Sequence, residues 1–241
     1  MVIGGSSGVG KATVEALASE GAKVTAVARD PEKLRALKAE TGNAVTTLEG
    51  DATEPAFVER LLRELRPDLV VLAAGVMPPM GPLDELDWES FSKTWNADTK
   101  ASFVLLKQAL TLPLRPGSTV VLVSSGAAIG GSPLSGGYAG AKRMQWFLAG
   151  YAQRVSDAKK LGIRVLAVLP KQLIEGTIIG RRAAEGYAAM NGTTAEVYMK
   201  RWEVPLDVDK VASAIVSGLR GEVPAEVNAI AVTGSGTEVL A

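Results

Sequence analysis

Three residues near the middle of the sequence have the types and the order needed to move a proton without an imidazole. Tyr138 and Lys142 stand four positions apart in a predicted helix, so their side chains share one helical face. A free phenol has a pKa of about 10, and a neighbouring ammonium stabilises its phenolate form. Ser125 follows a predicted strand, Thr119–Val123, at the carboxyl edge where ligands bind in open α/β sheets. Tyr138 is therefore a candidate proton donor and acceptor for a carbonyl or alcohol oxygen that Ser125 orients.

A glycine-rich loop, Gly-Gly-Ser-Ser-Gly-Val-Gly, opens the chain between a short strand and a predicted helix. Unsatisfied backbone N–H groups and the positive end of a helix favour a bound diphosphate at such a point. Gly4 permits the tight turn, Gly8 the close approach of phosphate, and Gly10 the packing of helix on sheet. Ser6 and Ser7 add hydroxyl donors. The spacing of the glycines differs from the G-x-G-x-x-G pattern of dinucleotide-binding loops, which weakens this interpretation. The alternative is that the loop binds no dinucleotide and needs glycine only for positive φ angles.

Taken alone, a glycine-rich turn and a Tyr-x-x-x-Lys pair are weak signals. Their order along the chain, with a strand-end serine between them, predicts an oxidoreductase that uses a nicotinamide dinucleotide.

The residue after the second predicted strand bears on which dinucleotide is bound. Folds that bind NAD carry an acidic residue there, whose carboxylate would repel a 2′-phosphate. This sequence has Ala28 and then Arg29, and a guanidinium can bind that phosphate through parallel hydrogen bonds. NADP(H) is therefore favoured over NAD(H). The alternative is that Arg29 is a surface residue before a helix that Asp30 caps and Pro31 begins.

The composition excludes several other classes. Cysteine and histidine are absent, which removes disulfides, thiolate and imidazole metal ligands, and any Ser-His-Asp hydrolase. No metal site is expected. Lys plus Arg and Asp plus Glu both number 26, so nothing in the charge balance favours nucleic acid. Glycines, serines and a proline break the longest uncharged stretch, Pro116–Ala141, and no signal peptide is recognisable, so we expect a cytoplasmic protein without membrane association.

Short β-branched runs alternate with amphipathic stretches of helical length, a pattern typical of a parallel sheet with helices on both faces. The predicted strands are Val2-Ile3, Lys23–Ala28, Ala44–Leu48, Leu69–Ala73, Thr119–Val123, Ile163–Leu169 and Asn228–Val232. The predicted helices are Val9–Glu20, Pro31–Glu40, Pro55–Leu65, Trp88–Leu112, Tyr138–Lys160 and Asp207–Leu219. We expect one domain over residues 1–241, with the irregular segment Lys171–Val204 covering the substrate.

These motifs together resemble the compact, single-domain branch of the short-chain dehydrogenase/reductase family across nearly the whole chain. The resemblance implies a Rossmann-type, doubly wound, mostly parallel sheet of seven strands, and a catalytic set of Ser125, Tyr138 and Lys142. Asp51 would receive the adenine amino group, although Asp51-Ala52-Thr53 could equally cap a helix. The implied cofactor-binding residues are Gly4, Ser6, Ser7, Gly8, Val9, Gly10, Arg29, Asp51, Ala52, Ala74, Gly75, Tyr138, Lys142 and Pro170.

The sequence also departs from the family pattern. Asp98 stands where the family's catalytic helix asparagine is usual, and Asn96 lies two positions earlier, so either residue or neither takes that role. The family's Pro-Gly after the sixth strand is Pro170-Lys171. Only Met1 to Ile3 precede the glycine loop, so either the first strand is short or the start of the sequence omits part of it. A shortened central strand would lose ladder hydrogen bonds.

The leading hypothesis is an NADP(H)-dependent enzyme that interconverts a carbonyl and a secondary alcohol. The alternative is an NADP(H)-binding sensor or interaction protein that has lost catalysis, and a third option is an epimerase or dehydratase with bound NAD. An apolar substrate pocket that can adapt its shape is suggested by Met77, Met80, Leu134, Tyr187, Met190 and Trp202. The alternative is that most of these residues are ordinary core or lid packing. Arg181 and Arg182 could attract an acidic substrate or be solvated charge.

Relatives form tetramers or dimers through the helices predicted at 88–112 and 138–160, which implies a homo-oligomer.

Overall fold

The computed structural model describes residues 1–240 and has one sheet at its centre. Eight strands follow the order β3-β2-β1-β4-β5-β6-β7-β8. Their bounds are β1 Val2–Ile3, β2 Val24–Ala28, β3 Val45–Glu49, β4 Leu69–Leu72, β5 Thr119–Val123, β6 Arg164–Pro170, β7 Ala229–Thr233 and β8 Gly236–Val239. Neighbouring strands from β3 to β7 are parallel, so their carboxyl ends share one edge. The strand order reverses between β1 and β4, the point at which doubly wound sheets bind ligands.

The predicted doubly wound fold is confirmed, but the prediction of seven strands is wrong. The eighth strand, β8, pairs antiparallel with β7 after a turn at Gly234-Ser235. All of its residues, Gly236–Val239, are exposed. An exposed edge strand has no need for alternating apolar residues, so the pattern that revealed the other strands is missing there.

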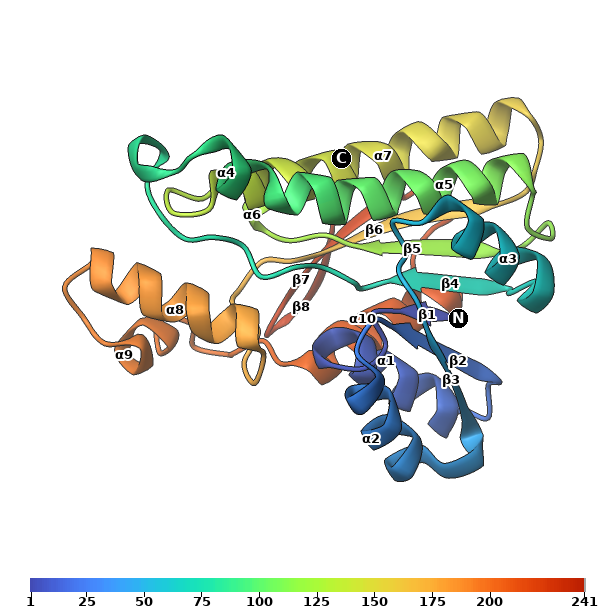
Figure 1. Cartoon of the computed structure of the whole chain (residues 1–241), viewed down its shortest axis with the longest axis horizontal. Coiled ribbons are helices and arrows are strands. Elements are labelled where there is room, and N and C mark those ends of the chain that lie inside the picture. The colour runs from blue at the N-terminus through green and yellow to red at the C-terminus, as the bar shows by residue number, and fades with distance from the viewer. Residues whose placement is uncertain (241) are drawn as a thin grey trace.

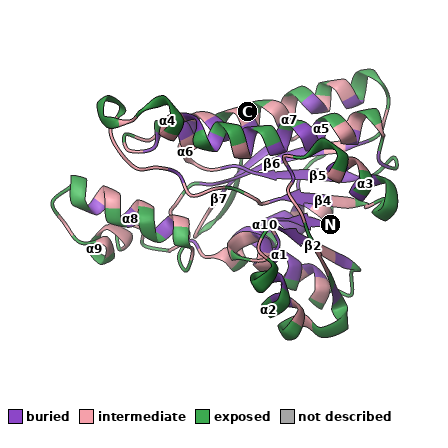
Figure 2. Ribbon diagram, viewed as in Figure 1, coloured by how far each residue is buried: buried purple, intermediate pink, exposed green. Residues whose placement is uncertain are grey.

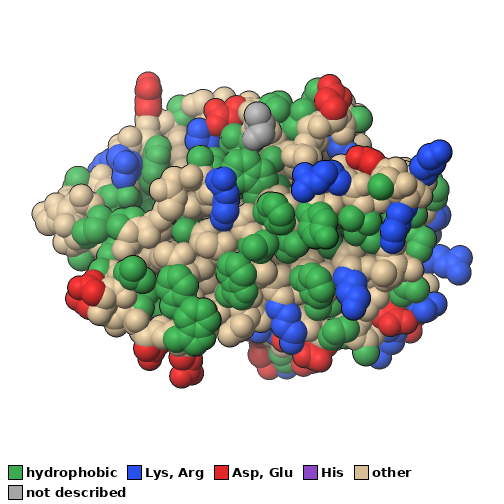
Figure 3. Space-filling model, turned by 90° about the horizontal axis from the view of Figure 1, so that it is seen from above, with side chains coloured by type: hydrophobic (Ala, Val, Ile, Leu, Met, Phe, Trp, Pro, Cys, Tyr) green, Lys and Arg blue, Asp and Glu red, His purple; other side chains and the backbone are tan. Residues whose placement is uncertain are grey.

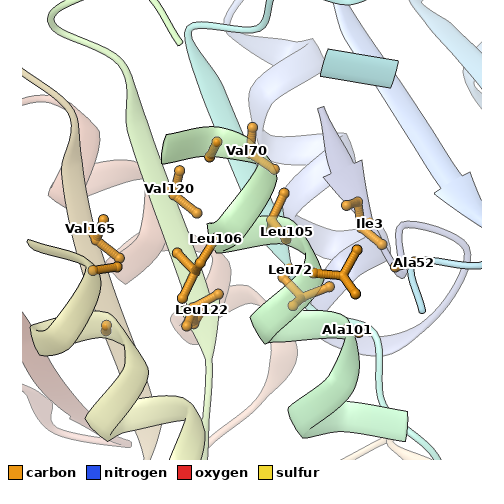
Figure 4. Packing of buried hydrophobic residues seen from close by; sticks show 14 of the residues in the cluster. Ile3, Ala52, Val70, Leu72, Ala101, Leu105, Leu106, Val120, Leu122 and Val165 are labelled. Carbon is orange, nitrogen blue, oxygen red and sulfur yellow. The ribbon is translucent and has the colours of Figure 1, made fainter. Parts of the chain in front are cut away.

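Helices cover both faces of the sheet (Figure 1). Those on one face are α3 (Pro55–Leu65), α5 (Lys100–Thr111) and α7 (Gly136–Ala158), and those on the other are α1 (Gly8–Ser19), α2 (Pro31–Thr41) and α10 (Val208–Leu219). Two apolar clusters fill the layers between helices and sheet. In the cluster on the α5 side, buried side chains of α5 lie against β4 and β5 (Figure 4): Leu105, Leu106, Val70, Leu72, Val120 and Leu122. Each such side chain contributes about 1.5–3 kcal/mol through burial.

The stretch predicted as one helix, Trp88–Leu112, is interrupted. It consists of α4 (Trp88–Thr94), a π-helical turn at Trp95–Thr99, and α5. A π-helical turn inserts an extra residue and rotates the residues around it, and such turns are frequent at functional sites. This one carries Asp98, which is buried.

The segment predicted as irregular, Lys171–Val204, contains two helices, α8 (Ile178–Met190) and α9 (Ala195–Met199). They project past the carboxyl edge of the sheet, and much of their surface is exposed (Figure 2). A shorter helix, α6 (Ala127–Gly130), follows β5 and was also missed. Within residues 1–240, no helix has the length and apolar character that crossing a bilayer requires.

The first strand is two residues long, as the sequence suggested, yet it pairs with both β2 and β4. The Ala73 N–H donates to the carbonyl of Ile3 at 2.8 Å, and the Gly4 N–H donates to Val27 at 2.7 Å. The glycine loop is therefore fixed at the edge of the sheet on both sides.

Candidate active site

A cleft of about 1220 Å³ runs along the carboxyl edge of the parallel strands. Its lining includes every sequence-predicted site residue except Gly10: Gly4, Ser6, Ser7, Gly8, Val9, Arg29, Asp51, Ala52, Ala74, Gly75, Asp98, Ser125, Tyr138, Lys142 and Pro170. Because these positions span most of the chain, their meeting in one cleft depends on the parallel topology.

The geometry of the opening loop explains two of its glycines. Gly4 has a φ of +85°, and a Cβ there would lie 2.4 Å from the backbone nitrogen of Ala74. A Cβ on Gly10 would lie 2.1 Å from the carbonyl oxygen of Gly4. Gly10 therefore allows α1 to pack directly on the glycine loop, whereas the sequence predicted that it would allow packing of the helix on the sheet.

The first turn of α1 presents backbone N–H groups to the cleft. Ser7 is the N-cap residue, but its side chain makes no capping hydrogen bond, and the first turn contains no acidic residue. The first N–H groups of a helix have no partner within it. This end of α1 can therefore accept an anion, and it fits the diphosphate of a dinucleotide.

Two cations, Arg29 and Lys33, line the cleft just after the end of β2. Arg29 is exposed, and its Nη1 lies 3.8 Å from Oδ2 of Asp51. The carboxylate of Asp30 accepts hydrogen bonds from the Glu32 and Lys33 N–H groups, so it is committed to capping α2, as predicted. Lys33 lines the cleft as well and was missed, although its place in the first turn of α2 could have indicated it.

Asp51 lies at the end of β3 and does not cap α3, whose N-cap residue is Glu54. Its Oδ1 accepts the Thr53 N–H at 2.8 Å within a local turn. Partial burial opposes ionisation, but these hydrogen bonds with Thr53 and the charges of Arg29 and Lys100 outweigh it and lower the pKa of Asp51.

Tyr138 and Lys142 share a face of α7, as their spacing predicted. The Lys142 Nζ lies 5.5 Å from the centre of the Tyr138 ring and 3.3 Å from the carbonyl oxygen of Val123 at the end of β5. The buried Ser124 hydroxyl donates to the Lys142 carbonyl at 2.7 Å. This bond fixes α7 against the end of β5, where Ser125 lies, and the Ser125 Oγ accepts the Ala127 N–H at 3.2 Å.

Asp98, rather than Asn96, meets the lysine. Its Oδ2 lies 3.1 Å from Nζ of Lys142, and the two side chains are 0% and 7% exposed. Its Oδ1 accepts the Val76 N–H at 3.0 Å, which connects the π-helical turn to the loop after β4. Asn96 is exposed and donates to Ser92.

The electrostatic effect on the lysine follows from this geometry. Burial alone disfavours the ammonium form, but the negative charge of Asp98, with a contribution from Tyr138, outweighs it and raises the pKa of Lys142. Lys142 therefore remains a cation across the neutral range.

The end of the cleft towards α8 and α9 is largely apolar. Five of the six residues suggested for a substrate pocket line it: Met77, Met80, Tyr187, Met190 and Trp202. Leu134 does not, and lies near Gly186.

Arg181 lines a separate cavity and Arg182 is exposed, whereas Arg201, which the sequence did not single out, lines the main cleft. Lys171 also lines the cleft, with its Nζ 2.5 Å from Glu238 on β8.

A profile of the family described as short chain dehydrogenase matches residues 1–189. An uncharacterized oxidoreductase of Escherichia coli is 28% identical over 241 residues, covering 95% of this chain and 80% of that protein. A hydroxynaphthalene reductase of Aspergillus fumigatus is 28% identical over 239 residues, covering 90% of this chain and 85% of the relative.

Solved structures agree with these matches. Levodione reductase superposes with a TM-score of 0.83 at 25% identity and covers 97% of this chain and 95% of its own. The fold is also that of an NAD+-bound xylitol dehydrogenase (TM-score 0.82, 20% identity, 97% and 96% covered). An actinorhodin polyketide ketoreductase with NADPH gives a TM-score of 0.81 at 22% identity, with 97% and 95% covered.

Proposed function

The chain belongs to the short-chain dehydrogenase/reductase family of NAD(P)-dependent oxidoreductases, and we propose that it interconverts a carbonyl and a secondary alcohol with NADP(H), using Tyr138 as proton donor and acceptor. The observation that carries this proposal is the placement of Tyr138, Lys142 and Ser125 in the cleft that begins at the glycine loop.

The cleft's residues fit a dinucleotide. The uncapped N-terminus of α1, with Ser6 and Ser7, would hold the diphosphate, and Asp51 would hold the adenine. Lys142 would hold the nicotinamide ribose, with Ala74, Gly75 and Pro170 as neighbouring walls. Bound there, the nicotinamide supplies or accepts the hydride.

The remaining chemistry is proton transfer by the chain's own residues. In reduction, the Tyr138 hydroxyl gives its proton to the carbonyl oxygen as that oxygen gains negative charge. The permanent positive charge of Lys142, 5.5 Å from the ring, stabilises the phenolate left behind. Ser125, whose Oγ is oriented by the Ala127 N–H, donates to the same carbonyl oxygen and positions it. The reverse steps serve oxidation.

The preference for NADP(H) is supported by charges at the end of β2. Arg29 and Lys33 line this end of the cleft. Asp30, the nearest acid in sequence, is occupied by the N–H groups of α2 and is a poor partner for ribose hydroxyls. Arg29 and Lys33 do have acidic neighbours, Asp51 and Asp30, but both carboxylates also accept backbone N–H groups. The two cations are exposed and can still bind a 2′-phosphate.

A homo-oligomer is supported by the outer face of α5 and α7. Hydrophobic side chains gather on the face seen in Figure 3, and Phe103, Phe147 and Tyr151 are 54%, 55% and 53% exposed. Trp146, by contrast, packs against the core. Exposed aromatic side chains on two adjacent helices are typical of an interface. Sedimentation velocity of the parent and of Phe147→Glu tests this, with a smaller species expected for the variant.

The experiment that tests the proposed function follows the absorbance of reduced cofactor over a panel of ketones, aldehydes and quinones, with NADPH and NADH in parallel. We expect consumption with some carbonyl compounds and a higher kcat/KM with NADPH. A sensor would bind NADPH and consume none with any compound, and that result would overturn the proposal.

A further inference from the structure

The charged side chains that line the cleft are paired, with one exception. Four cations there have a carboxylate partner: Arg29 with Asp51, Lys33 with Asp30, Lys142 with Asp98, and Lys171 with Glu238. Arg201 has none within 4.0 Å among residues 1–240. It is therefore the one lining cation in the described chain whose charge no acidic side chain offsets.

Arg201 is held in place although it is exposed. Its Nη1 donates to the Tyr198 hydroxyl at 2.6 Å, and its guanidinium carbon lies 4.9 Å and 5.3 Å from the ring centres of Tyr198 and Trp202. Contact with two rings and a hydrogen bond to one hydroxyl restrict the guanidinium, so less side-chain freedom is left to lose on binding. An ordinary solvated arginine lacks these contacts.

A row of side chains connects this guanidinium to the helix that carries Tyr138. Tyr198 stacks on Tyr187 with ring centres 5.7 Å apart and planes inclined by 19°. The Tyr187 hydroxyl hydrogen-bonds to Ser132, which bonds to Ser135 at 2.6 Å. Ser135 immediately precedes α7, so the row fixes α8 and α9 against the start of that helix. Arg201 thus has a defined place relative to the reacting groups.

The chemistry of this end of the cleft selects the ligand group. A guanidinium presents several N–H donors in one plane, and the Tyr198 hydroxyl is the one side-chain acceptor that Arg201 has among residues 1–240. The donors that are left match the two oxygens of a carboxylate. No Asp or Glu from the segment 171–204 lines the main cleft, so an anion would meet no repulsion from that side. The lining there also includes the apolar side chains of Met77, Met80 and Met190, together with the uncharged polar Asn191.

We propose that Arg201 binds a carboxylate carried by the substrate, so that the enzyme acts on an oxo acid or hydroxy acid with an apolar body between the carboxylate and the reacting carbon. The inference rests on the proposed function for its reacting carbon, but the carboxylate site itself stands on the contacts of Arg201. The hydride and proton transfers are those already described, and the carboxylate takes no part in them.

Binding in the absence of cofactor gives the first test. Calorimetry compares matched pairs that differ only in charge, such as acetylbenzoate against acetylbenzamide and oxocyclohexanecarboxylate against its amide. One charge-assisted hydrogen-bonded contact corresponds to about a tenfold to hundredfold preference for the carboxylate. Arg201→Gln should abolish that preference, while Arg182→Gln, an exposed arginine of α8 outside the cleft lining, should retain it.

Turnover of the same pairs gives the second test and separates this inference from the proposed function. Arg201→Gln should raise KM for the oxo acids by about the same factor, with kcat and the KM for the amides unchanged within about twofold. If each oxo acid and its amide are turned over with the same kcat/KM, the Arg201 site is overturned and the proposed function stands. Carboxylate binding lost in Arg201→Gln, without turnover of any ketone, would uphold the site and overturn the function. A panel with no carboxylate preference in binding or turnover contradicts the inference.

Discussion

The carboxylate of Asp98 and the ammonium of Lys142 form a buried ion pair, with 3.1 Å between Oδ2 and Nζ. The pair joins the π-helical turn to α7, and the second oxygen of Asp98 accepts the Val76 N–H. One side chain therefore connects three segments around the cleft and keeps Lys142 charged beside Tyr138.

Removing the carboxylate should destabilise the fold. Asp98→Ala leaves a buried ammonium without its partner, and breaking such a pair costs about 3–5 kcal/mol. Burial then becomes the main influence on Lys142 and lowers the pKa of its ammonium. The free energy of unfolding from urea titrations measures the effect. Asn96→Ala, two positions earlier and exposed, is the matched control and should change stability by less than about 1 kcal/mol. Equal losses in the two variants would rule out the role given to Asp98.

Closing the space between α1 and the glycine loop should weaken cofactor binding. A Cβ on Gly10 meets the Gly4 carbonyl at 2.1 Å, and backbone cannot move aside as a flexible side chain can. Gly10→Ala should therefore displace α1, lower stability by about 1–3 kcal/mol and raise the Kd for NADPH. Gly140→Ala, where a Cβ meets nothing within 4 Å, is the control and should raise stability by about 0.5–1 kcal/mol. Unchanged NADPH binding in Gly10→Ala would show that the loop does not hold the diphosphate.

The charge beside β2 should set cofactor preference. Arg29→Gln removes the guanidinium proposed to bind the 2′-phosphate, so the KM for NADPH should rise about tenfold or more while that for NADH stays within about twofold. Arg35→Gln removes an exposed arginine of α2 that lies outside the cleft lining and should affect neither. If both cofactors respond equally to Arg29→Gln, the preference has another source.

The N-cap of α10 predicts a pH-dependent contribution to stability. Asp207 accepts the Lys210 N–H at 2.8 Å, which lowers the pKa of its carboxyl. A group with a lowered folded-state pKa stabilises the fold above its unfolded value of about 3.9 and loses that contribution as the pH falls through the folded value.

Asp207→Ala should therefore lower the free energy of unfolding by about 1 kcal/mol at neutral pH. The difference from the parent should close as the pH falls below about 4. Asp209→Ala, which removes an acidic residue from the same first turn without removing the cap, should show a smaller loss. A difference that is the same at neutral and acid pH would show that the ionised cap contributes nothing.

The buried parallel strands were the most predictable part of the fold. All five residues of Thr119–Val123 are buried, and such strands appear in a sequence as continuous apolar runs with sharp ends. The shared helical face of Tyr138 and Lys142 was equally predictable, because residues four positions apart lie on the same face of a helix.

The features that the sequence left open or missed have separate physical causes. Sequence periodicity assumes a regular helix, so it could not choose between Asn96 and Asp98 across a π-helical turn. The role proposed for Arg201 depends on its contacts with two rings and on the pairing of every other cation that lines the cleft, which no local sequence pattern contains. Helix α8 contains two glycines, Gly180 and Gly186, both packed closely against neighbours, and glycine inside a helix weakens the helical signal.

The measurement that tests the central claim most directly compares turnover and NADPH binding in Tyr138→Phe. Loss of one hydroxyl should reduce kcat by a factor of about 100 to 10,000, with the Kd for NADPH unchanged within about twofold. Tyr151→Phe, an exposed tyrosine on the same helix, should match the parent in both. Turnover by Tyr138→Phe at the parent's rate would contradict the assignment of Tyr138 as the proton donor and acceptor.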